Sequence, residues 1–131
     1  MSTDLLRFVT HDRHPPYGQR SGVFQAAYRL LRRNALSESD RIELRNQLDW
    51  FKESLAIPHR FTASRYPRAQ DTAISWVRAS ASEHVARLRR LAEILQSIGI
   101  DVEELRTKRP GYVVYEDEHQ VVALPFADTA T

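Results

Sequence analysis

The strongest constraint on the fold is the pattern of apolar residues between positions 71 and 126. In the first part of this stretch, apolar side chains recur every three or four residues, which places them on one face of a helix. Gly99 follows this stripe, at a position where a left-handed residue commonly ends a helix. Segments 112–115 and 120–124 are instead rich in β-branched and aromatic residues, a composition typical of strands. We therefore expect one long amphipathic helix that ends at Gly99 and is followed by a β-hairpin. The helical stripe consists of Ile74, Val77, Ala81, Val85, Leu88, Leu91, Leu95 and Ile98.

Two further helices are predicted in the first half of the chain. Ser21 is a suitable N-cap for a helix over residues 22–34, and Ser37 is a suitable N-cap for a second helix that Pro58 ends. Because the connection between them is short, the two helices are expected to lie against each other as a helical hairpin.

Residues 5–10 and 102–107 are the remaining strand candidates. An isolated β-hairpin is only marginally stable in water, so the C-terminal hairpin needs further strands or a helix to cover it. The sequence therefore predicts an α+β fold, in which a helical hairpin and one long helix form a three-helix layer on a small antiparallel sheet. The length of 131 residues predicts a single domain, with a tail over residues 127–131 that we expect to fray.

The composition excludes several kinds of site. The chain contains no cysteine, which rules out disulfides, thiolate zinc sites and cysteine nucleophiles. No apolar run approaches the roughly 20 residues that a membrane-spanning helix needs, and the first residues lack the basic and apolar regions of a signal peptide. We expect a cytoplasmic protein without a membrane partner.

The charge pattern argues against a dedicated DNA-binding domain. The net charge of +2 comes from 19 basic and 17 acidic residues, whereas nucleic-acid-binding domains usually concentrate a larger basic excess on one face. A helix-turn-helix interpretation also fails, because segment 38–53 carries three basic and five acidic side chains. An acidic recognition helix would be repelled by the DNA phosphates. Nucleic-acid binding through basic loops remains an alternative.

The histidines are the candidates for catalysis. The spacing of Trp76 and His84 places them on one helix flank, where an imidazole could act as a general base or be a hydrogen-bonded boundary residue. His119 lies in an acidic turn, for which a solvated turn is the alternative. Segment 11–14 offers two imidazoles and a carboxylate, but its neighbouring arginines oppose a metal ion. Glycine-rich phosphate loops, GxSxG elbows and HExxH helices are absent, and we predict no cofactor and no metal site.

Two segments, 60–68 and 106–109, are rich in basic residues, and the first of them also contains aromatic residues. Arginine and aromatic residues are enriched at protein interfaces, and the same combination suits single-stranded nucleic acid. The leading hypothesis is a protein-binding accessory module without catalysis, which uses segment 61–68 or the exposed hairpin edge and which could also self-associate. Nucleic-acid binding is the second hypothesis, and an enzyme centred on His84 or His119 is the third. The candidate binding residues are Arg60, Phe61, Arg65, Tyr66, Arg68, Trp76, His84, Arg106, Lys108 and Arg109.

The C-terminal sequence also carries a resemblance. Residues 99–105 and 109–126 resemble the shared ending, RPGYVVYEDE-QVVA-PF, of short bacterial proteins of uncharacterised function. The resemblance covers the predicted hairpin and implies a bacterial source. It implies no activity, cofactor or catalytic residue.

Overall fold

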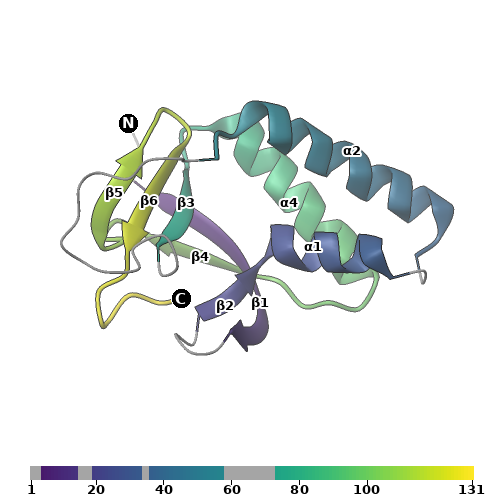
Figure 1. Ribbon diagram of the computed structural model, residues 1–131, viewed down its shortest axis with the longest axis horizontal. Helices are drawn as coiled ribbons and strands as arrows, with labels where there is room; N and C mark the ends of the chain where they lie inside the picture. Colours follow the sequence, from purple (N-terminus) through teal and green to yellow (C-terminus); the bar gives the residue numbers. More distant parts are fainter. Residues whose placement is uncertain (1–3, 15–18, 34–35, 58–72) are drawn as a thin grey trace.

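The computed structural model describes residues 4–14, 19–33, 36–57 and 73–131. Within these residues the chain forms three helices and a six-stranded antiparallel sheet, which confirms the predicted α+β class with its three-helix layer. The helices lie together beside the sheet (Figure 1). None of the described helices is long and apolar enough to cross a membrane. In chain order the elements are β1 (Leu5–His14), β2 (Gln19–Gly22), α1 (Val23–Arg32), α2 (Glu38–Ser54), β3 (Ile74–Arg78), α4 (Ser82–Ser97), β4 (Glu103–Thr107), β5 (Tyr112–Glu116) and β6 (Gln120–Leu124).

The sheet is organised around β1, which pairs with three other strands. Leu5 lies opposite both Arg78 of β3 and Thr107 of β4, so these two strands occupy opposite edges of β1. Val9 likewise lies opposite both β2 and β4, which means that β2 and β3 share one edge of β1. From β3 the sheet continues to β6 and ends at β5.

Apolar side chains are buried on both faces of the sheet. Leu6, Phe8 and Val77 join residues of α1, α2 and α4 in the larger core cluster. Because successive side chains of a strand point to opposite faces, the residues between them form a second cluster on the face opposite the helices. This second cluster consists of Leu5, Val9, Ile74, Trp76, Leu105 and Val121.

Two of the predicted helix ends are confirmed. Ser37 is the N-cap of α2, where its hydroxyl accepts a hydrogen bond of 3.2 Å from the N–H of Asp40. Gly99 has a φ of 100°, and the N–H of Ile100 donates to the carbonyl of Leu95 at 3.0 Å. This is the left-handed ending expected after α4.

The predicted start of the first helix is wrong by one residue. Gly22, not Ser21, is the N-cap of α1, and its N–H donates to the side chain of Gln25 at 3.2 Å. Ser21 belongs to β2, and its hydroxyl hydrogen-bonds Asp12 and Arg29. These bonds join residues nine and eight positions apart on different elements, so the residues next to Ser21 could not reveal them.

The long helix predicted from position 71 onward is wrong in its first part. Ile74–Arg78 is strand β3, and α4 begins only at Ser82. A short apolar segment fits both periods, because Ile74 and Trp76 alternate as in a strand, whereas Ile74 and Val77 keep a helical spacing. Pairing with β1 and β6 engages β3 on both edges, and such tertiary pairing overrides a local pattern. Trp76 and His84 therefore lie on different elements and do not share a helix flank.

The predicted C-terminal hairpin is confirmed as β5 and β6, although three residues, and not the expected four, connect the strands. Asp117 organises this turn: its carboxylate accepts from the N–H groups of His119 and Gln120, at 2.8 and 2.9 Å, and from the hydroxyl of Tyr115 at 2.8 Å. Burial alone raises the pKa of Asp117, but these bonds outweigh it and lower the pKa below its usual value.

Candidate functional site

Four of the predicted binding residues line one pocket. Trp76 lies on β3, Arg106 lies on β4, and Lys108 and Arg109 follow β4 directly. They surround a cavity of about 400 Å³, which we call the Trp76 pocket. His84 lies elsewhere, on α4. The other five predicted residues fall outside the described residues: Arg60, Phe61, Arg65, Tyr66 and Arg68.

Trp76, one of the residues that line the Trp76 pocket, carries an unsatisfied donor. Trp76 is 1% exposed, and its indole Nε1 has no hydrogen-bond partner among the described residues. Buried polar groups in native proteins nearly always have a partner, so an orphaned N–H requires an explanation. A bound group that accepts a hydrogen bond would satisfy this donor.

The rim of the Trp76 pocket is basic. Arg106 donates to Asp4 at 2.9 Å, and the Lys108 ammonium lies 3.9 Å from the same carboxylate. Arg109 has no carboxylate partner among the described residues. Its guanidinium lies over the ring of Phe126, 5.1 Å from the ring centroid. Arg109 is therefore the rim cation that remains available to an anionic group.

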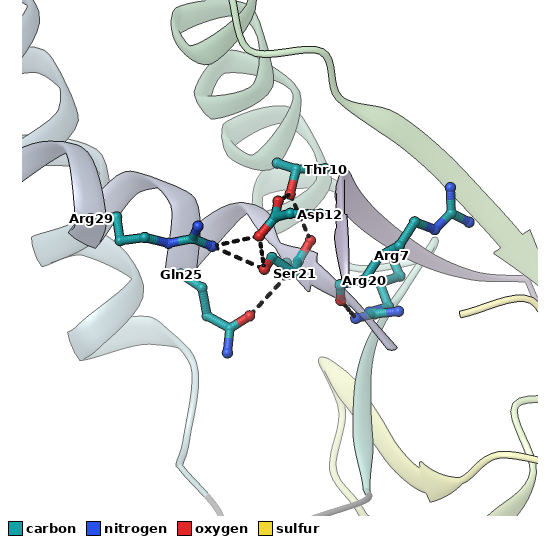
Figure 2. Close-up of polar contacts among 8 residues, drawn as sticks. Arg7, Thr10, Asp12, Arg20, Ser21, Gln25 and Arg29 are labelled. Atoms are coloured by element: carbon teal, nitrogen blue, oxygen red, sulfur yellow. Dashed lines mark hydrogen bonds and ion pairs between the residues drawn. The ribbon is translucent and has the colours of Figure 1, made fainter. Parts of the chain in front are cut away.

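The C-terminal residues form another wall of the same pocket, through positions 128–130. The carbonyl of Thr131 accepts hydrogen bonds of 2.9 Å from Arg7 Nη1 and from the N–H of Arg20. Arg7 also donates to the carbonyl of Arg20 at 2.6 Å (Figure 2). Burial, and then the positive charge of Arg20, lower the pKa of Arg7 to about 10. The residues of the predicted frayed tail are thus tied to β1 and β2.

A polar cluster around Asp12 joins β1, β2 and Arg29 in the last turn of α1 (Figure 2). The carboxylate of Asp12 accepts from Ser21 at 2.6 Å, from Arg29 at 3.0 Å and from Thr10. The bond from Ser21 is the largest of the effects that hold the pKa of Asp12 well below its usual value. Sequence reasoning grouped Asp12 with two histidines as a weak metal motif. Within the described residues, no three potential metal ligands come together, and Asp12 instead anchors the start of α1.

Replacing Asp12 by asparagine is expected to lower the free energy of unfolding by about 1–2 kcal/mol at pH 7. The loss is no larger because the Asp12 side chain is about half exposed, and solvent screens its interactions. Because folding lowers the pKa of Asp12, its contribution is fully present above pH 4 and is lost as the pH falls further. Urea denaturation at pH 7 and at pH 3 measures both effects. Asp101→Asn, at an exposed carboxylate, is the control and should change little. An equal loss for Asp12→Asn at both pH values would contradict this prediction.

The predicted histidine candidates meet in a second cavity, between α2, the start of α4 and the β5–β6 turn. His84 is buried, and its Nε2 donates to the carbonyl of Ser54 at 2.7 Å. The rings of His84 and His119 stack with centroids 4.2 Å apart, and Trp50 lies edge-on to His84 at 4.8 Å. Among the described residues, neither imidazole hydrogen-bonds a serine hydroxyl, so this cavity of about 670 Å³ shows no paired nucleophile and base. His84 is thus hydrogen-bonded, as the alternative to a general base expects, but it is buried and its partner is Ser54 of α2.

Seven of the fourteen arginines among the described residues form ion pairs with carboxylates. Nucleic-acid binding needs cations that are free to replace counterions along a phosphate backbone. An arginine that already faces a carboxylate serves that purpose poorly. The pairs are Arg20–Glu103, Arg29–Asp12, Arg78–Glu116, Arg87–Glu83, Arg89–Glu104, Arg90–Glu43 and Arg106–Asp4.

The outer edge of β5 is the other feature that the sequence pointed to. Among the described residues, β5 pairs with β6 alone. Tyr112 and Val113 are 52% and 46% exposed on this strand. Tyr112 also contacts Phe126 edge-on at 4.8 Å, next to Arg109. We call this strand and its exposed side chains the β5 edge.

Comparisons of the chain with known protein families, curated proteins and solved structures found no match. The resemblance of the C-terminal sequence to short bacterial proteins stays a prediction. The Trp76 pocket, the cavity beside His84 and His119, and the β5 edge are therefore the features that bear on function.

Proposed function

We propose that this chain is a protein-binding module without catalysis, and that a second copy of the chain docks on the β5 edge. The observation that carries the proposal is the exposure of Val113 on a strand that, among the described residues, ends the sheet. An edge strand presents a row of backbone N–H and C=O groups that can pair with another strand. Exposed apolar side chains on the same strand add area that a partner can bury.

The other long edge of the sheet is less suited to docking. β4 carries Glu103, Glu104 and Arg106, and charged residues on an edge discourage the addition of another strand. β5 has no charged residue from Tyr112 to Tyr115. A register shift between Val113 and Tyr115 interrupts the ladder to β6, so a docked strand is expected to pair over only a few residues.

The charges at the two ends of β5 favour a second copy as the partner. Lys108 and Arg109 precede the strand, whereas Glu116 and Glu118 lie at and beyond its end. In an antiparallel pair around a twofold axis near Val113, the basic end of each strand lies beside the acidic end of the other. The β5 edge is therefore complementary to itself, and parallel pairing would bring like charges together.

Val113→Lys is expected to weaken self-association by at least about tenfold. A lysine on the edge resists desolvation, and the twofold axis brings the two introduced charges close together. Sedimentation velocity over a concentration series measures the dissociation constant. Ile42→Lys introduces the same charge at another exposed apolar residue, on α2, and should leave self-association unchanged.

A charge exchange tests the antiparallel arrangement. Glu118→Lys alone should weaken self-association, and Lys108→Glu together with Glu118→Lys should restore it, because positions 108 and 118 lie opposite each other across a twofold axis near Val113 and the double variant exchanges their charges. A wild-type chain that remains monomeric throughout the series would refute the proposal. Tight, steeply salt-dependent binding of a single-stranded oligonucleotide by that monomer would favour the nucleic-acid alternative.

A further inference from the structure

We infer that the Trp76 pocket binds a small monocarboxylate with an apolar body. The ligand carboxylate accepts a hydrogen bond from Trp76 Nε1 and pairs with the guanidinium of Arg109. This site is additional to the β5 edge, and it requires no second copy of the chain.

The orphaned indole donor defines one contact of the ligand. Trp76 Nε1 can only donate, and it has no acceptor among the described residues. Leaving such a donor unpaired costs free energy that a bound acceptor recovers. Because protein atoms cover Nε1, binding must include a small shift of the pocket wall. In an apolar pocket, an indole N–H would pair with a neutral acceptor. Here the charge of the rim decides whether the acceptor is neutral or anionic.

The rim charges select a single negative charge. Arg106 and Lys108 already share the carboxylate of Asp4, which leaves Arg109 as the rim cation without a carboxylate partner among the described residues. Asp128 also lines the pocket and opposes groups with a higher negative charge. One available cation and one neutral donor match the two oxygens of a carboxylate. They match a phosphate dianion poorly.

The walls and the size of the pocket set the rest of the ligand. Trp76 and Leu105 line the pocket and are 1% and 8% exposed, so the shift that uncovers Nε1 must also uncover their apolar surface. The volume of about 400 Å³ lies within the range of pockets that hold small organic molecules. The third wall is the C-terminal segment, which the bonds from Arg7 and Arg20 to Thr131 hold against the sheet. An aromatic or aliphatic acid therefore fits the lining better than a bare anion does.

Nuclear magnetic resonance of the ¹⁵N-labelled full chain tests the inference, because the chain has two indole N–H groups and Trp76→Phe identifies the signal of Trp76. Phenylacetate is expected to shift that signal saturably and to leave the Trp50 signal in place. Phenylacetamide, which has the same shape without the charge, should bind at least about tenfold more weakly. Inorganic phosphate should cause no saturable shift.

Three variants complete the test. Arg109→Gln and Trp76→Phe should each weaken phenylacetate binding by about tenfold, and Trp76→Phe binding is followed by calorimetry. Arg45→Gln, at an exposed arginine of α2, should have no effect. Circular dichroism confirms that each variant is folded. The inference is overturned if phenylacetate causes no saturable shift, if the amide or phosphate binds as well, or if Arg109→Gln binds like the wild type.

The two proposals can fail separately. Val113→Lys removes the proposed docking edge and should bind phenylacetate with unchanged affinity. Trp76→Phe should self-associate like the wild type. A joint loss of both properties in either variant would contradict the independence of the pocket from the β5 edge.

Discussion

Replacing Gly111 by alanine is expected to destabilise the fold by more than about 3 kcal/mol. Gly111 has a φ of 130°, a conformation that side-chain-bearing residues rarely adopt. A Cβ atom there would also lie 1.8 Å from the carbonyl oxygen of Leu124 and 2.8 Å from the Cα of Pro125. Backbone atoms cannot move aside as a flexible side chain can, so β5 must separate from the end of β6.

Gly99→Ala is the matched control for this prediction. Gly99 also has a positive φ, of 100°, but a Cβ at this position would have no neighbour within 4 Å. Only backbone strain remains, which costs about 1–2 kcal/mol. Urea denaturation of both variants separates strain from collision. Equal losses for the two variants would show that the close approach of Gly111 to Leu124 does not limit stability.

Phe51→Ala is expected to cost about 3–5 kcal/mol, which is the range for removing a buried phenylalanine ring. Phe51 lies in the main core cluster, on α2. Its ring meets Phe24 of α1 edge-on at 4.9 Å and Trp50 at 5.0 Å. The substitution therefore removes contacts that join two helices, and it leaves a cavity that neighbouring rings can fill only in part.

Thermal and urea denaturation measure this loss, with two variants for comparison. Phe51→Leu keeps most of the volume and should cost only about 1 kcal/mol. Lys52→Ala changes the exposed neighbour on the same helix and should have almost no effect. A loss below that of Phe51→Leu would mean that the aromatic cluster is not part of the cooperative core.

The elements that the sequence predicts well are those whose determinants are local. The cap at Ser37 and the left-handed Gly99 act within one turn of a helix, and both were predictable from neighbouring residues. β3 was not predictable in the same way. Its apolar residues satisfy a helical spacing, and only pairing with β1 and β6, which are distant in the sequence, selects the strand.

The candidate sites show the same difference between local features, which the sequence reveals, and distant contacts, which it does not. The basic residues after β4 were visible as a segment, but their position beside Trp76 depends on the order of β3, β1 and β4 in the sheet. The stacking of His84 on His119 likewise joins α4 to the β5–β6 turn, across 35 positions of sequence. The helical spacing predicted Trp76 as the neighbour of His84, whereas in the structure His84 stacks on His119. No single-sequence pattern encodes such long-range contacts.

The central position of β1 has a consequence for how the protein is made. β1 leaves the ribosome early, but the partners of its first residues, Arg78 and Thr107, are synthesised about 70 and 100 residues later. Until β3 is synthesised, β1 can pair only with β2. The edge of β1 that pairs with β4 stays open until Thr107 has been made. Contacts this distant in sequence form slowly, and unpaired apolar strands are prone to aggregation. We therefore expect the nascent chain to depend on rapid completion of its last third, or on a chaperone that covers β1 in the meantime.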